Sequence, residues 1–418
     1  MQDRILHDIA RVLIEAKEAV YKQDTERLAK LSDTVIHNAS VFQDEDTIEI
    51  AIAIYALAKL LHRKAELHDQ FLALISHLEH LFSQKQYHAY RRSLKHLLTL
   101  VDEGDNNVTK LAKEVIASAR VKKGSKLYYH GISVAQSACA LGISQWELYN
   151  YIGKAERDED ETASVANTRK RLAYTKQLLK QKDNVIVFDA GPVITSAING
   201  LLYSLPEIKK LFNADFLIPQ AVHYELIEKP MSTKKHKLEA YHVIKLINNN
   251  TLHTVDKKYL HAQTIEYLNL INTTFHAYGN PIKIIHEGEM QALTLLKALG
   301  GRTLVVDERT TRYLLETPER VVQRFERRLH TKVTVDKEKL KQFQEAFKDI
   351  QPIRSVELYT VALTHGVFAD LLIGMPIRNN EKQFYEGLLW GLKLAGCGVS
   401  NREISALIRA LNISEMKK

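Results

Sequence analysis

The fold class of this chain is decided by residues 185–194, which read VIVFDAGPVI. Four apolar residues typical of a buried strand run directly into Asp189, and Pro192 follows where a helix would begin. Three further runs of strand type come later: FLI at 216–218, KII at 283–285 and TLVV at 303–306. Helical patterns separate these runs. Strands that alternate with helices predict an α/β fold, in which a parallel sheet with right-handed crossovers is flanked by helices.

The predicted α/β domain spans residues 185–335. Its helices are expected at Pro192–Tyr203, Gln220–Glu228, Ser232–Ile247, Lys257–Asn272, Gly288–Leu299 and Arg309–Leu315. Lys332–Val335 is a candidate for one more strand. Residues 336–418 return to a helical pattern, and Ser400 with Glu403 forms a capping box that marks a helix start. We therefore expect a helical C-terminal region.

Residues 1–122 read as helix throughout. Glycine is absent until Gly104, and apolar residues recur at spacings of three and four, which is typical of amphipathic helices. No fixed-period repeat is present, so an all-α bundle is favoured over a regular solenoid, and a scaffold or docking role is expected. Helical segments are expected near 25–38, 45–64, 67–82, 84–102 and 107–119. Residues 156–184 form a charged linker or surface helix, first acidic and then basic.

The composition excludes several classes of protein. Cys139 and Cys397 are the only cysteines, which rules out a disulfide framework and a thiolate zinc site. The chain start lacks the apolar core of a signal peptide, and the longest apolar stretch, Thr47 to Leu61, is too short to span a bilayer. We expect a cytoplasmic protein with no membrane partner. The net charge of +8 favours a polyanionic partner.

Residues 123–155 contain a helix-turn-helix pattern. Ser133 with Gln136 and Ser144 with Glu147 form two consecutive capping boxes, and Gly142 lies in the short turn between them. This pattern predicts possible DNA contact through residues 130–153, and the alternative is a helical corner that binds nothing. The candidate base-reading side chains on the second helix are Gln145, Asn150 and Lys154.

Four acidic residues stand out by position. Asp189 and Asp307 each follow a predicted strand directly, whereas Glu225 and Glu289 lie on the helices after the second and third strands. The carboxyl ends of parallel strands form the ligand crevice of such sheets, so we expect the four carboxylates to converge there. Their mutual repulsion would require a cation, and carboxylate oxygens suit Mg²⁺ or Mn²⁺. Taken singly, each acid could instead favour a helix N-terminus.

Basic residues are candidates for phosphate contact. Arg309 and Arg312 lie one helical turn apart after Asp307, and bidentate contact with phosphate oxygens is one interpretation; an exposed helix face is the other. Glu308 is a candidate for a residue that surrounds the four acids, either supporting them or facing the substrate. Basic residues also cluster at 169–182 and 320–332, where an RNA backbone would bind and be released by salt.

Residues 185 to about 330 resemble a PIN domain, the metal-dependent ribonuclease fold. The motifs that carry the resemblance are VIVFDAGPVI around Asp189, IPQAVHYELI around Glu225, HEGEMQALTLL around Glu289 and TLVVDERTTR around Asp307. The resemblance implies that these four acids hold one or two Mg²⁺ or Mn²⁺ ions as ligands and catalytic residues, and that RNA phosphodiester bonds are hydrolysed by a metal-bound water.

One position departs from the pattern of the family. Many PIN domains carry Ser or Thr two residues after the first Asp, and this chain has Gly191 there. The support that this Ser or Thr gives to the site in other members is therefore expected to be lost here, or to be supplied by Thr195 or Ser196. VapC-like toxin ribonucleases share the fold but are usually far shorter, and the helical N-terminal half and tail resemble those of multi-domain archaeal-type members.

The sequence therefore predicts a metal-dependent endoribonuclease that binds RNA, and a homodimer is possible. The leading alternative is a nucleic-acid-binding regulator that works through the helix-turn-helix, with a catalytically silent PIN-like domain. The helix-turn-helix also resembles the short antitoxins that accompany some toxin nucleases. A third hypothesis, an autoinhibited toxin–antitoxin fusion, predicts that residues 125–155 pack over the acidic crevice.

Overall fold

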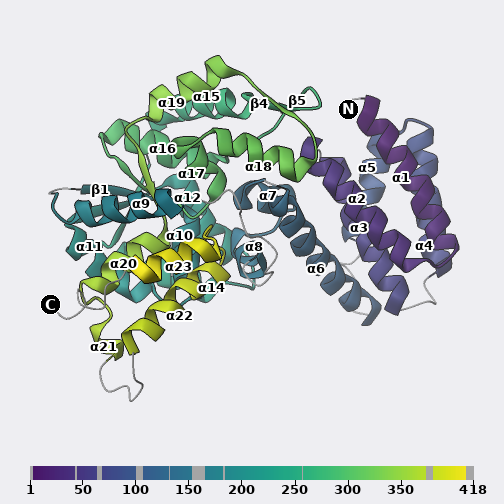
Figure 1. Cartoon of the computed structure of the whole chain (residues 1–418). Coiled ribbons are helices and arrows are strands. Elements are labelled where there is room, and N and C mark those ends of the chain that lie inside the picture. Colours follow the sequence, from purple (N-terminus) through teal and green to yellow (C-terminus); the bar gives the residue numbers. More distant parts are fainter. Residues whose placement is uncertain are drawn as a thin grey trace. The chain divides into compact units, whose positions relative to one another are not determined.

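A computed structural model of the chain describes residues 3–42, 45–63, 68–99, 107–130, 132–152, 165–181, 184–256, 258–372 and 380–410. The chain divides into two compact units. The first comprises Met1–Ile132 and Ser137–Ile143, and the second comprises Ser133–Gln136 and Ser144–Lys418. Each unit is described by itself, with the element labels of Figure 1.

The first unit is a helical bundle, as the sequence predicts for this region. Its helices are α1 (Asp3–Tyr21), α2 (Thr25–Phe42), α3 (Glu45–Arg63), α4 (His68–Ser83), α5 (Tyr87–Thr99) and α6 (Asn107–Tyr129). Helix α3 packs against α2, α5 and α6, and its apolar residues from Ile48 to Leu61 are buried. Burial of these apolar side chains is the main force that holds such a bundle together.

The second unit is built on a five-stranded sheet whose strand order is β3-β2-β1-β6-β8, with every neighbouring pair parallel. The strands are β1 (Asn184–Phe188), β2 (Ala214–Pro219), β3 (Leu252–Val255), β6 (Thr303–Val305) and β8 (Gln351–Ile353). After β1, the chain adds β2 and then β3 on one side of β1, and later adds β6 and then β8 on the other side of β1. The strand order therefore reverses between β1 and β6, where parallel sheets open a ligand crevice.

Helices flank this sheet (Figure 1). Those between β1 and β6 are α10 (Ala190–Ile198), α11 (Leu205–Phe212), α12 (Gln220–His223), α13 (Lys229–Met231), α14 (Lys237–Asn248), α15 (His261–Asn272) and α16 (Glu287–Leu299). Two 3₁₀ turns, Leu202–Ser204 and Lys258–Leu260, and one π-helical turn, Tyr224–Glu228, interrupt this series. Those that follow are α17 (Arg309–Glu316), α18 (Glu319–Leu329), α19 (Lys337–Phe347), α20 (Ser355–Thr364), α21 (Ala369–Leu372), α22 (Asn380–Leu394) and α23 (Asn401–Ala410).

Three strand predictions are confirmed, at β1, β2 and β6, and the one at 283–285 is wrong. The side chain of Asn272 replaces strand pairing there, because its Oδ1 accepts hydrogen bonds from the backbone N–H groups of Ile284 and Ile285, at 2.8 and 3.0 Å. The candidate strand at Lys332–Val335 is β7 (Val333–Val335). It pairs with β4 (Phe275–Ala277), which also pairs with β5 (Asn280–Pro281), in a separate antiparallel sheet.

The α/β region extends further than the sequence predicts. Strand β8 lies in the main sheet although it falls after residue 335, and β3 was not predicted at all. The basic half of the expected linker forms α9 (Val165–Leu178), which packs against α20 and α23 within the second unit. The acidic residues 156–162 lie outside the described residues. No helix among the described residues is long and apolar enough to cross a membrane.

The helix-turn-helix pattern is present as α7 (Val134–Ala140) and α8 (Gln145–Ile152). Glu147 and Ser144 form the predicted capping box, since the Ser144 backbone N–H donates to Glu147 Oε2 and the Glu147 N–H donates to Ser144 Oγ. Gly142 has a φ of 63° and ends the first helix, a left-handed conformation that favours glycine.

Candidate active site

Asp189 lies at the carboxyl end of the central strand. Its backbone N–H donates to Val305 O at 3.0 Å, so β1 and β6 stay paired up to this residue. Its side chain then caps helix α10 by accepting from the Gly191 N–H. The residue is 6% exposed. Asp189 is therefore fixed at the point where the strand order reverses, as the sequence predicts.

Glu225 reaches the same place from the π-helical turn after β2. Turns of this kind occur frequently at functional sites. Its carboxylate packs against Gly288, whose missing side chain leaves room for it: a Cβ added to Gly288 would lie 3.3 Å from Glu225 Oε1. His286 Nδ1 lies 3.3 Å from the same oxygen and forms an ion pair with it when the imidazole is protonated.

Glu289 is held from both sides. Its Oε2 accepts from the His286 backbone N–H at 2.8 Å, which closes the first turn of α16, and its Oε1 accepts from Thr311 Oγ1 at 2.5 Å. Glu289 is 3% exposed. The capping interaction that the sequence offers as an alternative role is therefore real, and the same carboxylate also faces the other acids.

Electrostatic repulsion shows which carboxylates are neighbours. Burial, together with the charges of Glu225 and Glu308, raises the pKa of Asp189 to about 7. Burial likewise raises the pKa of Glu289 to about 8, with contributions from Asp189 and Glu308. We call Asp189, Glu225, Glu289 and Glu308 the acidic cluster. Glu308 was predicted only as part of the surroundings.

Asp307 has different neighbours from those of the acidic cluster. Its Oδ1 accepts from the Ser355 backbone N–H at 2.9 Å and from Cys397 Sγ at 3.1 Å, and its Oδ2 accepts from Thr195 Oγ1 at 2.8 Å. It is wholly buried. The structure therefore brings Asp189, Glu225 and Glu289 together with Glu308, and surrounds Asp307 with hydroxyl, thiol and amide donors instead.

The expected substrate-binding side chains lie in the interior. Arg309 and Arg312 are 5% and 2% exposed, and Arg312 Nη2 donates to Gly398 O at 2.9 Å, so neither presents a guanidinium on the surface. Thr195 supports Asp307, and Ser196 donates to Pro192 O within its own helix. The structure thus gives Thr195 and Ser196 no role beside Asp189, and it places both arginines away from an exposed phosphate path.

Tyr149 occupies the space that a side chain at position 191 would fill. A Cβ added to Gly191 would overlap the Tyr149 hydroxyl, and one added to Gly396 would overlap the Tyr149 ring. Glycine at 191 and 396 is therefore what allows helix α8 to pack beside Asp189. Sequence reasoning did not assign Tyr149 to this site, although glycine in place of Ser or Thr at position 191 was a signal that another side chain fills the space there.

Other parts of the helix-turn-helix that belong to the second unit also contact this region. The Val134 N–H donates to Glu308 Oε2 at 3.3 Å, and Gln136 Nε2 donates to Ile285 O at 3.1 Å. Trp146 stacks on His236 at 5.7 Å. Val134 thus contacts Glu308, and Tyr149 packs against Gly191 beside Asp189; both residues belong to the stretch 125–155 that the hypothesis of an autoinhibited fusion places over the crevice.

The second helix of the motif is poorly suited to reading DNA bases in this arrangement. Gln145 is 5% exposed and Trp146 is wholly buried, while Asn150 is half-buried. Lys154, the third candidate for base contact, lies outside the described residues. The apolar side of α8 packs within the second unit.

The donor chemistry of the cluster suits a hard divalent cation. It consists of carboxylate oxygens, which Mg²⁺ and Mn²⁺ prefer. The raised pKa values show that ionising Asp189 and Glu289 together is costly unless a cation is near. As placed, however, the described residues include no group of three or more His, Cys, Asp or Glu side chains that could hold a metal ion.

Comparisons of this chain with protein-family models, with curated proteins and with solved structures find no match.

Proposed function

We propose that the second unit is a PIN-like endoribonuclease dependent on Mg²⁺ or Mn²⁺. The observation that carries the proposal is the acidic cluster at the switch point of the parallel sheet, where Asp189 and Glu289 have raised pKa values because of burial and mutual repulsion. Buried like charges cost stability, and perturbed carboxylates in a crevice are typical of catalytic sites.

The side chains that would hold the ion are Asp189, Glu225, Glu289 and Glu308. A bound divalent ion supplies activation of water and charge neutralisation at a phosphate. The residues of the chain orient this set: Thr311 and the His286 backbone fix the Glu289 carboxylate, and Gly288 allows Glu225 to approach. Asp307 acts as a positioning residue, since it ties the end of β6 to α20 through Ser355.

Residues 133–136 and 144–152 pack beside the acidic cluster, and this packing favours a nuclease whose site must open before RNA binds. All four acidic residues are buried, with exposures between 3% and 7%, and Val134 contacts Glu308 directly. An RNA phosphate would need residues 133–136 and 144–152 to move before it could reach the cluster. The alternative, a nucleic-acid-binding regulator with a silent domain, has less support because Gln145 and Trp146 are buried.

The test is cleavage of a labelled single-stranded RNA with Mn²⁺ and with a chelator. We expect cleavage by the wild type only with Mn²⁺, and at least a 100-fold loss in Asp189→Asn, because the amide is a poorer ligand for a hard ion. Asp215→Asn is the matched control, because Asp215 is on β2 with a side chain that is 70% exposed. Equal cleavage by Asp189→Asn, or cleavage in excess chelator, would overturn the proposal.

A further inference from the structure

A cavity of about 420 Å³ opens at the carboxyl ends of β2 and β3, in the second unit. Pro219 ends β2 and Val255 ends β3, and both line the cavity. Helices α12, α15 and α16 supply the other walls through Gln220, His261 and Gln291. Ligand pockets in proteins commonly measure about 300–1,000 Å³, and this edge of a parallel sheet is where they form.

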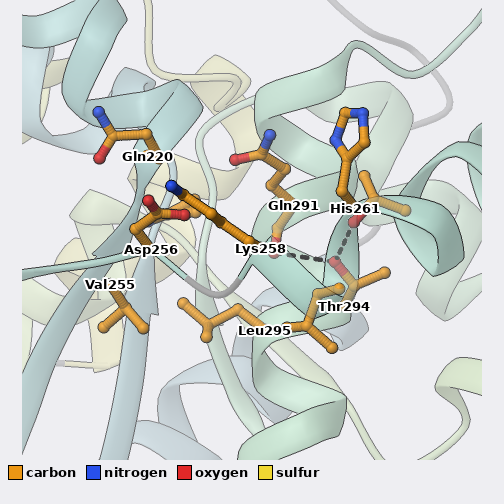
Figure 2. A pocket seen from close by; sticks show the side chains of 11 residues that line it. Gln220, Val255, Asp256, Lys258, His261, Gln291, Thr294 and Leu295 are labelled. Carbon is orange, nitrogen blue, oxygen red and sulfur yellow. Dashed lines mark hydrogen bonds between the residues drawn. The ribbon is translucent and has the colours of Figure 1, made fainter.

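The lining of the cavity combines apolar and polar surfaces. Figure 2 shows Val255 and Leu295 at one end, with Gln220, Asp256 and Lys258 on one side of the cavity and His261 and Gln291 on the other. This lining therefore offers an apolar surface for a flat ring, amide and carboxylate groups for its polar edge, and cations for an attached phosphate.

Several of these polar side chains lack a hydrogen-bond or ion-pair partner in the part of the chain that the structure describes. Among the described residues, no hydrogen bond or ion pair is made by the side chains of Gln220, Asp256, Lys258 or His261. Gln291 differs, since its Oε1 accepts from the Ala221 N–H at 3.0 Å and its Nε2 donates to Glu287 Oε1 at 3.0 Å. These two hydrogen bonds hold the Gln291 side chain in place, whereas the other four side chains are available to a ligand.

We propose that this cavity binds the base and phosphate of a single nucleotide. Amide side chains such as Gln220 form bidentate hydrogen bonds with base edges, and Asp256 accepts from exocyclic amino groups. Lys258 and His261, when protonated, provide the positive charge that a phosphate requires. Val255 and Leu295 bury the face of the ring.

The cavity lies close to the acidic cluster, and this inference rests on the proposed nuclease function. The cavity lies at the carboxyl ends of β2 and β3, and Asp189 follows the carboxyl end of β1, which pairs with β2. Gln291 and Glu289 share helix α16, two residues apart and therefore on different faces of it. On this proposal, a single RNA strand with a phosphate at the cluster runs along this edge of the sheet and places a flanking nucleotide in the cavity, so the cavity determines sequence preference.

The experiment measures binding of each of the four nucleoside 5′-monophosphates to the full chain by ligand-observed NMR, in chelator so that no metal ion at the acidic cluster contributes to phosphate binding. We expect the wild type to bind at least one of them, and Gln220→Ala and Lys258→Ala to weaken that binding by roughly tenfold or more. Gln344→Ala and Lys341→Ala are matched controls, because both residues are exposed on α19 outside the cavity. These controls should bind as the wild type does.

The outcome separates this inference from the nuclease proposal. Asp189→Asn should keep mononucleotide binding although cleavage is lost, because Asp189 does not line the cavity. Mononucleotide binding that depends on Gln220 and Lys258, without any metal-dependent RNA cleavage, would support the cavity and refute the nuclease. Cleavage by a wild type that binds none of the four mononucleotides, or unchanged binding in Gln220→Ala and Lys258→Ala, would overturn the inference alone.

Discussion

The second unit has two regions of buried carboxylates, and the two regions differ in the charged groups that surround them. In the first, which we call the ion-pair network, Arg171 and Arg354 lie among Glu316, Glu357 and Glu403. Arg171 Nη1 is 2.8 Å from Glu316 Oε1, and Arg354 Nη1 is 3.0 Å from Glu403 Oε1. The acidic cluster has no arginine or lysine partner of this kind among the described residues.

The pKa values follow this difference. Burial alone would raise the pKa of Glu357, but the positive charges of Arg354 and Arg171 hold it below its ordinary value. The same holds for Glu403, whose pKa is lowered. In the acidic cluster burial and like charges act in the same direction and raise the pKa of Glu289 to about 8. Similar burial therefore accompanies lowered carboxyl pKa values beside the arginines and raised values in the acidic cluster, where a bound cation would relieve the repulsion.

The largest effect is expected from breaking the ion-pair network. Arg354→Ala leaves Glu357 and Glu403 buried with fewer partners, and removal of one member of a buried pair typically costs about 3–5 kcal/mol. The free energy of unfolding, measured in urea, should fall by that amount. Arg402→Ala, at an exposed position on α23, should leave it within about 0.5 kcal/mol. If Arg354→Ala changed stability as little as Arg402→Ala does, the network would not be structural.

Asp307 and Glu308 are adjacent in the chain but have different surroundings, so variants of the two residues test how surroundings determine the effect of a buried carboxylate on stability. Asp307→Ala removes the acceptor of Ser355, Thr195 and Cys397, so the free energy of unfolding should fall by about 2–3 kcal/mol, as for buried donors left without partners. Glu308→Gln removes a charge from the acidic cluster and should leave stability equal or higher. Thermal unfolding of both variants in chelator checks this order. The reverse order would place Asp307 in the cluster and Glu308 outside it.

The smallest of these effects concerns pH. Carboxyl groups whose pKa is higher in the folded than in the unfolded protein bind more protons when folded, so the free energy of unfolding falls as pH rises between the two pKa values. For Asp189 and Glu289, metal-free protein should lose stability from about pH 4 to about pH 8. Asp189→Asn should flatten this slope and raise stability at pH 8 by on the order of 2 kcal/mol. Urea unfolding at several pH values measures both. An unchanged slope would contradict the raised pKa of Asp189.

The elements that sequence reasoning found are those with a local signal. The apolar run before Asp189 predicted β1, and the capping boxes at Ser144 and Ser400 marked helix starts that the structure confirms. Asp189, Glu225 and Glu289 were placed together because the carboxyl ends of parallel strands meet at one edge. These predictions needed only chain order and side-chain type.

What the sequence could not predict depends on contacts between distant residues. Nothing local distinguishes Asp307 from Glu308, because the choice is made by Ser355 and Cys397, which lie far along the chain. The missed strand β8 is short, and Pro352 lies within it at the edge of the sheet. The loss of a strand at 283–285 was decided by Asn272, another distant residue.

The acidic cluster is proposed to hold a divalent cation, and Mn²⁺ titration followed by electron paramagnetic resonance tests this most directly. The wild type should bind Mn²⁺, and Asp189→Asn and Glu308→Gln should each weaken binding by roughly tenfold or more, while Asp215→Asn should not. Weakened binding by both cluster variants is the predicted result. Absence of Mn²⁺ binding by the wild type, or binding that all three variants leave unchanged, would contradict the account.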